Sequence, residues 1–87
     1  MPPVVSIIVP VLNEQETINR TIASLAGACR GFKAEIIIVD GDLTGSTIND
    51  LDTNQVITLV APAGRASQMN AGAKAASGGI LLFVHAD

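Results

Sequence analysis

Four short apolar runs are spread along the 87 residues, and they limit the chain to one class of fold. The runs cover residues 4–9, 34–40, 56–60 and 80–84 and consist mainly of isoleucine, valine and leucine. Apolar runs of this length predict strands of a parallel sheet that is covered by helices. Pro10 sets the end of the first strand, because a strand accepts proline only near its end. An aromatic content of 2% also fits a core of branched aliphatic side chains.

The segment after the first strand predicts an amphipathic helix. Asn13 offers a side-chain cap with Glu16 three residues later, and Gly31 is well placed to end the helix. The residues that recur at near-helical spacing are Ile18, Ile22, Leu25 and Cys29. We therefore expect a helix that connects the first strand to the second.

Two further helices are predicted between the later strands. A turn-rich stretch over residues 41–47 leads into a short helix through Ile48 and Leu51. Residues 66–77 are rich in alanine, and such small side chains let a helix sit close to a sheet. The residues expected on one core-facing side of this helix are Met69, Ala73 and Ala76.

Strands and helices that alternate in this order predict an α/β fold, a Rossmann-like parallel sheet of about four strands with flanking helices. The length indicates a single domain over residues 1–87. Ligands of such sheets bind beyond the carboxyl ends of the strands, where the strand order reverses. The polar residues that follow the predicted strand ends are Asn13, Glu14, Asp40, Asp42, Arg65, His85 and Asp87.

These side chains indicate a site for a divalent cation and a diphosphate. Carboxylates suit magnesium or manganese, one imidazole is tolerated, and Arg65 adds a charge-assisted contact to phosphate. Competing signatures are missing from the sequence, because no Gly-x-Gly-x-x-Gly follows the first strand and no Gly-Lys-Ser/Thr is present. Cys29 lies within a predicted helix, away from His85, which argues against a thiol nucleophile.

Composition excludes several other classes of protein. A net charge of −3 with five scattered basic residues argues against nucleic acid as a partner. A single cysteine argues against a disulfide scaffold and fits a reducing compartment. No apolar run approaches the roughly 20 residues of a transmembrane helix, and no basic signal-peptide region precedes the first strand. We therefore expect a cytoplasmic chain with no transmembrane segment.

Four blocks of the sequence resemble the family 2 glycosyltransferases of the GT-A fold, in the order of that family. The first strand ends in Pro10-x-x-Asn13-Glu14, and the second runs into Asp40-Gly41 and a turn similar to the family's Asp-Gly-Ser-x-Asp-x-Thr. Residues 64–72 resemble the start of the helix before the family's metal motif, and residues 79–87 resemble the strand that ends in it. The chain thus looks like the N-terminal, nucleotide-binding half of a GT-A domain.

This resemblance implies a nucleotide-diphosphate sugar as donor and transfer of the sugar to an acceptor hydroxyl. The substrate-binding residues that it implies are Pro10, Asn13, Glu14, Asp40, Asp42 and Arg65. The first three would line the base and ribose pocket, Asp40 would contact the nucleoside, and Arg65 would approach ribose or phosphate.

The resemblance also implies a Mn²⁺ or Mg²⁺ ion that bridges the diphosphate. Asp87 falls on the second acid of the family's Asp-x-Asp metal motif, and His85 replaces the first acid. Histidine can still bind a metal through a neutral ring nitrogen. His85 and Asp87 are therefore the expected metal ligands.

Two departures from the family bear on activity. Leu43 and Gly45 stand where the family turn has a small polar residue and an acid, which predicts altered hydrogen bonds in the turn. Family members also continue past the position of Asp87 into a half that supplies the acceptor site. We therefore expect no sugar transfer by these 87 residues alone.

Single residues among these also have simpler structural explanations. The chain as a whole has alternative functions. Asn13 alone is a helix cap, and Asp40 alone starts a turn. The chain could be a non-catalytic nucleotide-binding module, or a truncated remnant that pairs with a second copy through an open edge of strand 80–84. Peripheral attachment at the cytoplasmic face of a membrane is also open, because family members often use lipid-linked acceptors.

Overall fold

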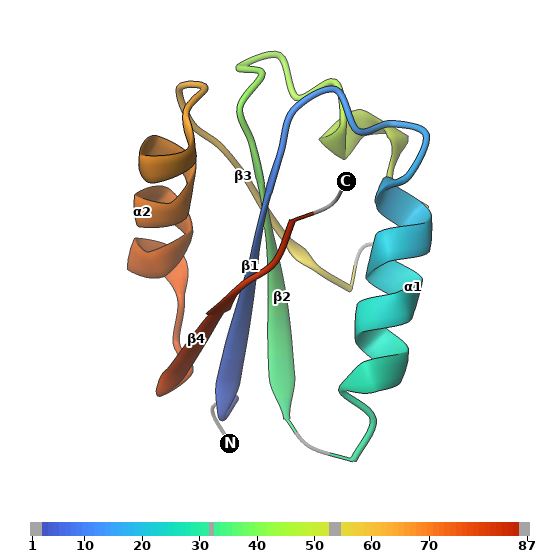
Figure 1. Cartoon of the computed structure of the whole chain (residues 1–87), viewed down its shortest axis with the longest axis vertical. Coiled ribbons are helices and arrows are strands. Elements are labelled where there is room, and N and C mark those ends of the chain that lie inside the picture. The colour runs from blue at the N-terminus through green and yellow to red at the C-terminus, as the bar shows by residue number, and fades with distance from the viewer. Residues whose placement is uncertain (1–2, 32, 53–54, 86–87) are drawn as a thin grey trace.

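A computed structural model describes residues 3–31, 33–52 and 55–85, and its centre is a parallel four-stranded sheet. The strands, in the order β3-β2-β1-β4 across the sheet, are β3 (Ile57–Val60), β2 (Ala34–Asp40), β1 (Val5–Val11) and β4 (Ile80–Phe83). Helix α1 (Ile18–Ala28) covers one face and helix α2 (Arg65–Ala75) the other, while a short 3₁₀ helix, η1 (Ile48–Asp50), follows β2 (Figure 1). The predicted α/β fold is confirmed.

The core lies on both faces of the two central strands, β1 and β2. Odd-numbered residues of β1 pack with α1, and the even-numbered Ile8 packs on the α2 side with Ile37 and Val39. Ile8, Ile37 and Val39 are completely buried. Because both faces need a cover, the strands are apolar throughout, which is the pattern seen in the sequence.

Strand β1 continues through Pro10, where the sequence predicted its end. Pro10 pairs in register with Val39 of β2. On the other side of β1, the last hydrogen bond with the β4 segment runs from the N–H of Val84 to the carbonyl of Ile8. The nitrogen of Pro10 points to the same side, beyond the last paired residue of β4, so its missing N–H removes no bond from the sheet.

Helix α1 begins at Ile18, so the predicted cap at Asn13 with Glu16 is wrong. The N-cap is Thr17, which makes no side-chain capping bond. The chain is held in another conformation because the N–H of Glu14 donates to Oγ1 of Thr47, at 3.0 Å. Asn13 takes a left-handed φ of 55°, which asparagine tolerates better than most residues.

Helix α2 sits close to the sheet, as its small residues predicted, but its buried face differs from the prediction. Gln68 and Gly72 are its buried residues, whereas Met69 is partly exposed. A Cβ at Gly72 would lie 2.4 Å from Cγ2 of Ile8, so only glycine permits this approach. The predicted Ala73 does pack on the core.

A hydrogen-bonded cluster ties the amino end of the sheet together. Oγ of Ser6 donates to Oε2 of Glu35 at 2.6 Å, and the N–H of Ser77 donates to the same oxygen at 2.7 Å. The N–H of Gly78 donates to Oγ of Ser6 at 2.8 Å. Burial raises the pKa of the Glu35 carboxyl, but the hydrogen bonds from Ser6, Ser77 and Gly78 together outweigh it and lower the pKa.

We predict that Glu35 stabilises the fold at neutral pH and loses this effect in acid. A carboxyl whose pKa is lowered by folding stabilises above its unfolded value, near 4.5, and the effect disappears as the pH falls through the folded pKa. Glu35→Gln should therefore lower the free energy of unfolding by about 1 kcal/mol at pH 7. Urea denaturation should show this difference shrinking below pH 4.5, whereas the exposed Glu16→Gln should show no such trend; equal behaviour would contradict the prediction.

Strand β4 forms one edge of the sheet, and its apolar side chains lie open. Ile80, Leu81, Leu82 and Phe83 are 39–52% exposed. Because the N–H groups of Ile80 and Val84 face β1, those of Leu81 and Phe83 face away from it. Such an uncharged edge lacks the usual protection against pairing with another strand.

Self-association through this edge stays a prediction. We expect sedimentation velocity at high concentration to show a dimer that Leu81→Lys dissociates, because a charge on an edge strand opposes pairing. Val60→Lys on the opposite edge, where Val60 is 48% exposed, serves as the control and should leave the dimer intact. A clean monomer of the unchanged chain would contradict the prediction.

Candidate functional site

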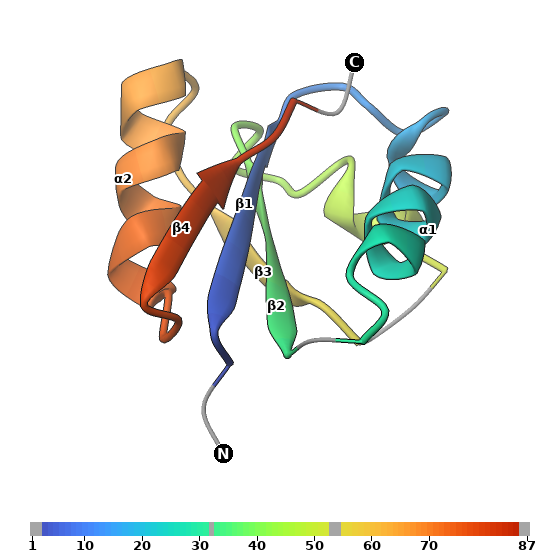
Figure 2. The ribbon, with the colours of Figure 1, turned by 60° about the horizontal axis from the view of Figure 1, so that its bottom comes forward.

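The strand order reverses beside β1. The chain passes from β1 to β2 and then β3 in one direction, and β4 returns to the free side of β1. Figure 2 shows that β4 and β1 run in the same direction, so that the carboxyl end of β4 lies on the same side of the sheet as the segment that follows β1. A ligand of a doubly wound sheet binds at this position.

A pocket of about 220 Å³ lies at this reversal point. Its lining residues are Pro10, Val11, Leu12, Glu14, Arg65, Gln68 and His85. Four of them, namely Pro10, Glu14, Arg65 and His85, were predicted as site residues from the sequence. We call this hollow the switch-point pocket.

The basic side chains of the switch-point pocket come from the first turn of α2 and from the segment after β4. Arg65 is the first residue of α2 and is exposed, as is His85. The N-cap of α2 is Gly64, which offers no capping side chain, and the first turn of the helix contains no acid. The partial positive charge of the helix N-terminus is therefore not offset from within the helix.

Glu14 brings the carboxylate of the switch-point pocket. Its main chain is fixed by Thr47, and its carbonyl accepts the N–H groups of Thr17 and Ile18 at 3.1 and 2.9 Å. The segment after β1 is thus tied both to the turn after β2 and to the start of α1. These bonds determine where the partly buried Glu14 side chain begins.

Asp40 lies at the end of β2 but outside the lining of the switch-point pocket. Its carboxylate is completely buried and accepts three backbone N–H groups. Oδ1 accepts from Asp42 at 2.9 Å, and Oδ2 accepts from Thr47 at 2.9 Å and Ile48 at 3.2 Å. In this structure Asp40 organises the turn that holds Glu14 in place, and its contact with a nucleoside stays a prediction.

Asp42 and Asn13 also lie away from the switch-point pocket. Oδ1 of Asp42 accepts the N–H and the hydroxyl of Thr44 at 3.0 and 2.8 Å. The pKa of the Asp42 carboxyl is lowered most by the nearby Ser46 side chain and further by hydrogen bonds from Thr44. The hydroxyl of Ser46 lies outside full hydrogen-bond geometry. Asn13 borders a separate, largely acidic hollow at the start of α1.

The two departures from the family turn are both accommodated. Leu43 points outward with 67% of its surface exposed. Gly45 has a φ of 72°, a conformation that glycine adopts without strain, and its N–H donates to the carbonyl of Asp42 at 2.8 Å. The turn therefore closes through its own hydrogen bonds without the acid.

The expected metal ligands are only partly within the described structure. His85 lines the switch-point pocket, whereas Asp87 lies outside the described residues. Within residues 3–31, 33–52 and 55–85, no three acidic, histidine or cysteine side chains gather as a metal site. Glu14 and His85 are the two candidate side-chain donors in the pocket, so a divalent cation there would need further ligands such as phosphate oxygens or water.

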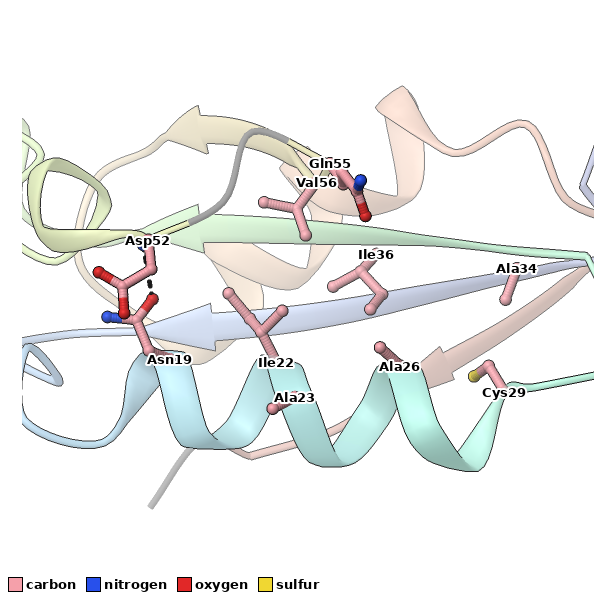
Figure 3. A pocket seen from close by; sticks show the side chains of 10 residues that line it. All are labelled: Asn19, Ile22, Ala23, Ala26, Cys29, Ala34, Ile36, Asp52, Gln55 and Val56. Atoms are coloured by element: carbon pink, nitrogen blue, oxygen red, sulfur yellow. Dashed lines mark hydrogen bonds between the residues drawn. The ribbon is translucent and has the colours of Figure 1, made fainter.

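A larger cavity of about 550 Å³ lies elsewhere, between α1 and the sheet (Figure 3). Its lining residues are Asn19, Ile22, Ala23, Ala26, Cys29, Ala34, Ile36, Asp52, Gln55 and Val56. The N–H of Asp52 donates to Oδ1 of Asn19 at one end, and the rest of the lining is mostly apolar. This cavity is a weaker candidate for a ligand site despite its size, because it lacks convergent charged groups and lies away from the carboxyl ends of the strands.

We predict that Asp40 matters more for stability than its neighbour Asp42. Asp40→Asn places an N–H₂ group against backbone donors, and we expect a loss of about 2–3 kcal/mol in the free energy of unfolding. Asp42→Asn keeps one acceptor oxygen for Thr44 and should cost clearly less than Asp40→Asn. Chemical denaturation of the two variants measures the difference, and equal losses would contradict a structural role for the buried carboxylate.

Comparisons with known proteins bear on the family to which this chain belongs. The search of curated proteins finds no match to this chain. Among the described residues, no helix has the length and apolar character needed to cross a membrane. The sequence model of the family described as glycosyl transferase family 2 matches residues 6–87, through the N-terminal part of the family's domain. With a match over this range and a sheet of the corresponding GT-A type, the chain belongs to glycosyltransferase family 2.

Proposed function

We propose that this chain binds the nucleoside diphosphate part of a nucleotide-sugar donor in the switch-point pocket. The observation that carries the proposal is the position of Arg65, which stands in the first turn of α2 and lines a pocket at the point where strand order reverses. A cation in the first turn opposes the helix dipole, and a bound phosphate offsets this cost. Membership of the family supports a role in sugar transfer.

The other pocket residues suit the remaining parts of such a ligand. Pro10 and Leu12 offer an apolar wall, and the carboxylate of Glu14 can accept hydrogen bonds from ribose hydroxyls. The volume of about 220 Å³ is below the roughly 300–1,000 Å³ typical of whole ligand sites. We therefore assign the pocket to the diphosphate and ribose, with the sugar extending beyond it.

We further propose that His85 and Asp87 hold a Mn²⁺ or Mg²⁺ ion when the donor is bound. One imidazole and one carboxylate leave most coordination positions for phosphate oxygens and water. The bound cation would offset the charge of the diphosphate. Transfer of the sugar also needs an acceptor in line and usually a base, and we assign neither role to a residue of the pocket.

Calorimetric titration with UDP in the presence of Mn²⁺ tests the proposal. We expect Arg65→Ala to weaken binding about tenfold or more, as the loss of a charge-assisted hydrogen bond predicts. Arg20→Ala is the matched control, because Arg20 is exposed on α1, on the other face of the sheet. Binding should also weaken when EDTA replaces Mn²⁺ or when His85 is changed to alanine.

The outcomes separate the alternatives. Absence of binding by the unchanged chain would reject the donor-binding proposal and leave the self-associating remnant as the better hypothesis. Binding that Arg65→Ala does not weaken would place the nucleotide elsewhere. Transfer of the sugar to an acceptor by the unchanged chain would contradict both the expected inactivity of these 87 residues and the non-catalytic binding module.

A further inference from the structure

We propose that Gln68 is a positioning residue that holds Arg65 in place for the diphosphate. The inference rests on the proposed nucleotide site and adds to it a residue that does not itself supply the charge. Gln68 lies one helical turn after Arg65 and is only 5% exposed, which is unusual for a glutamine with a polar amide. A buried amide of this kind needs hydrogen-bond partners, and their identity indicates its role.

The amide of Gln68 joins the ends of two strands. Nε2 donates to the carbonyl of Val11 in β1 and to the carbonyl of Val39 in β2, each at 2.9 Å. Both of its N–H groups are thereby used. These carbonyls lie at the carboxyl ends of the strands, where Pro10 and Glu14 also border the switch-point pocket.

The carbonyl of the same side chain joins these strand ends to the start of α2. Oε1 of Gln68 accepts the N–H of Gly64 at 3.2 Å. Gly64 is the N-cap of α2 and directly precedes Arg65. One side chain thus connects β1, β2 and the helix turn that carries Arg65, and this link fixes the distance of the arginine from the pocket's other wall.

The Gln68 side chain has room because the residue after β2, Gly41, carries no side chain. A Cβ at Gly41 would lie 2.9 Å from Oε1 of Gln68 and 3.2 Å from Cα of Ala63. The N–H of Gly41 also donates to the carbonyl of Val11, at 2.8 Å, so this carbonyl accepts two hydrogen bonds. The strand ends, the glycine and the glutamine therefore form one packed unit.

The proposal predicts that Gln68 and Arg65 act together in nucleotide binding, although no direct contact is needed between them. Gln68→Met keeps a similar volume and helix propensity but removes all three hydrogen bonds. The start of α2 then loses its link to the strand ends, and Arg65 no longer has a fixed position. The loss of affinity should therefore depend on the presence of Arg65.

A double-mutant cycle with UDP and Mn²⁺ tests this coupling. We expect Gln68→Met to weaken binding about tenfold in the chain with Arg65, but less than about twofold in the Arg65→Ala chain. Ala73→Gly is the matched control, because it weakens the same helix beyond Gln68 and changes neither the strand-end carbonyls nor the close approach of the helix at Gly72. Its effect on affinity should be small and the same with and without Arg65. Binding is measured at a temperature where denaturation curves show all variants folded.

Amide hydrogen exchange gives a second measurement that does not depend on nucleotide. Gln68→Met should speed exchange at the N–H of Gly64 more than at the core amides of β1, whereas Ala73→Gly should not. Unchanged protection at Gly64, or equal losses of affinity with and without Arg65, would overturn the positioning role. Failure of the unchanged chain to bind UDP would instead reject the proposed function itself, so the two failures are distinguishable.

Discussion

The parallel pairing of β1 with β2 is the constraint on which the rest of the structure depends. Val5 to Val11 pair in register with Ala34 to Asp40, and both faces of this pair carry apolar side chains. Each face must be covered, so α1 and α2 lie on opposite sides. Because β4 then pairs with the free side of β1, the strand order reverses there and creates the switch-point pocket.

The two covered faces differ in a way that affects the site. On the α2 side, Gly72 brings the helix backbone close to Ile8, and this short distance lets Gln68 reach the carbonyls of Val11 and Val39. On the α1 side, a cavity of about 550 Å³ remains between helix and sheet. The close packing of α2 is therefore what makes the first turn of this helix a precise part of the pocket.

Local sequence patterns predicted most of the fold and four of the seven residues that line the switch-point pocket. The apolar runs and the glycines that separate them identified the strands and helices, because burial on both faces leaves a strong signal. The predicted start of α1 was wrong because a long-range hydrogen bond from Glu14 to Thr47 holds the preceding segment in another conformation. Gln68 was missed because a single glutamine in a helix looks like an ordinary exposed residue, and only the tertiary structure reveals its partners. Asp40 was predicted to contact a nucleoside, which stays a prediction, and its burial shows a role in organising the turn that the motif alone does not indicate.

The distribution of charge bears on the proposed diphosphate site, because the chain as a whole has a net charge of −3. Asp40 pairs in the sheet with the pocket residue Val11, but its charge is offset by the N–H groups of Asp42, Thr47 and Ile48. Among the described residues that line the pocket, Glu14 is the only carboxylate, and the lining also includes His85 and Arg65, the first residue of α2. The turn after β2 thus removes a negative charge from the edge of the pocket and fixes the segment that carries Glu14. In the proposed site a diphosphate would therefore interact with Arg65 and the start of α2 rather than with the overall charge, because at physiological ionic strength charges more than roughly 8 Å apart are largely screened.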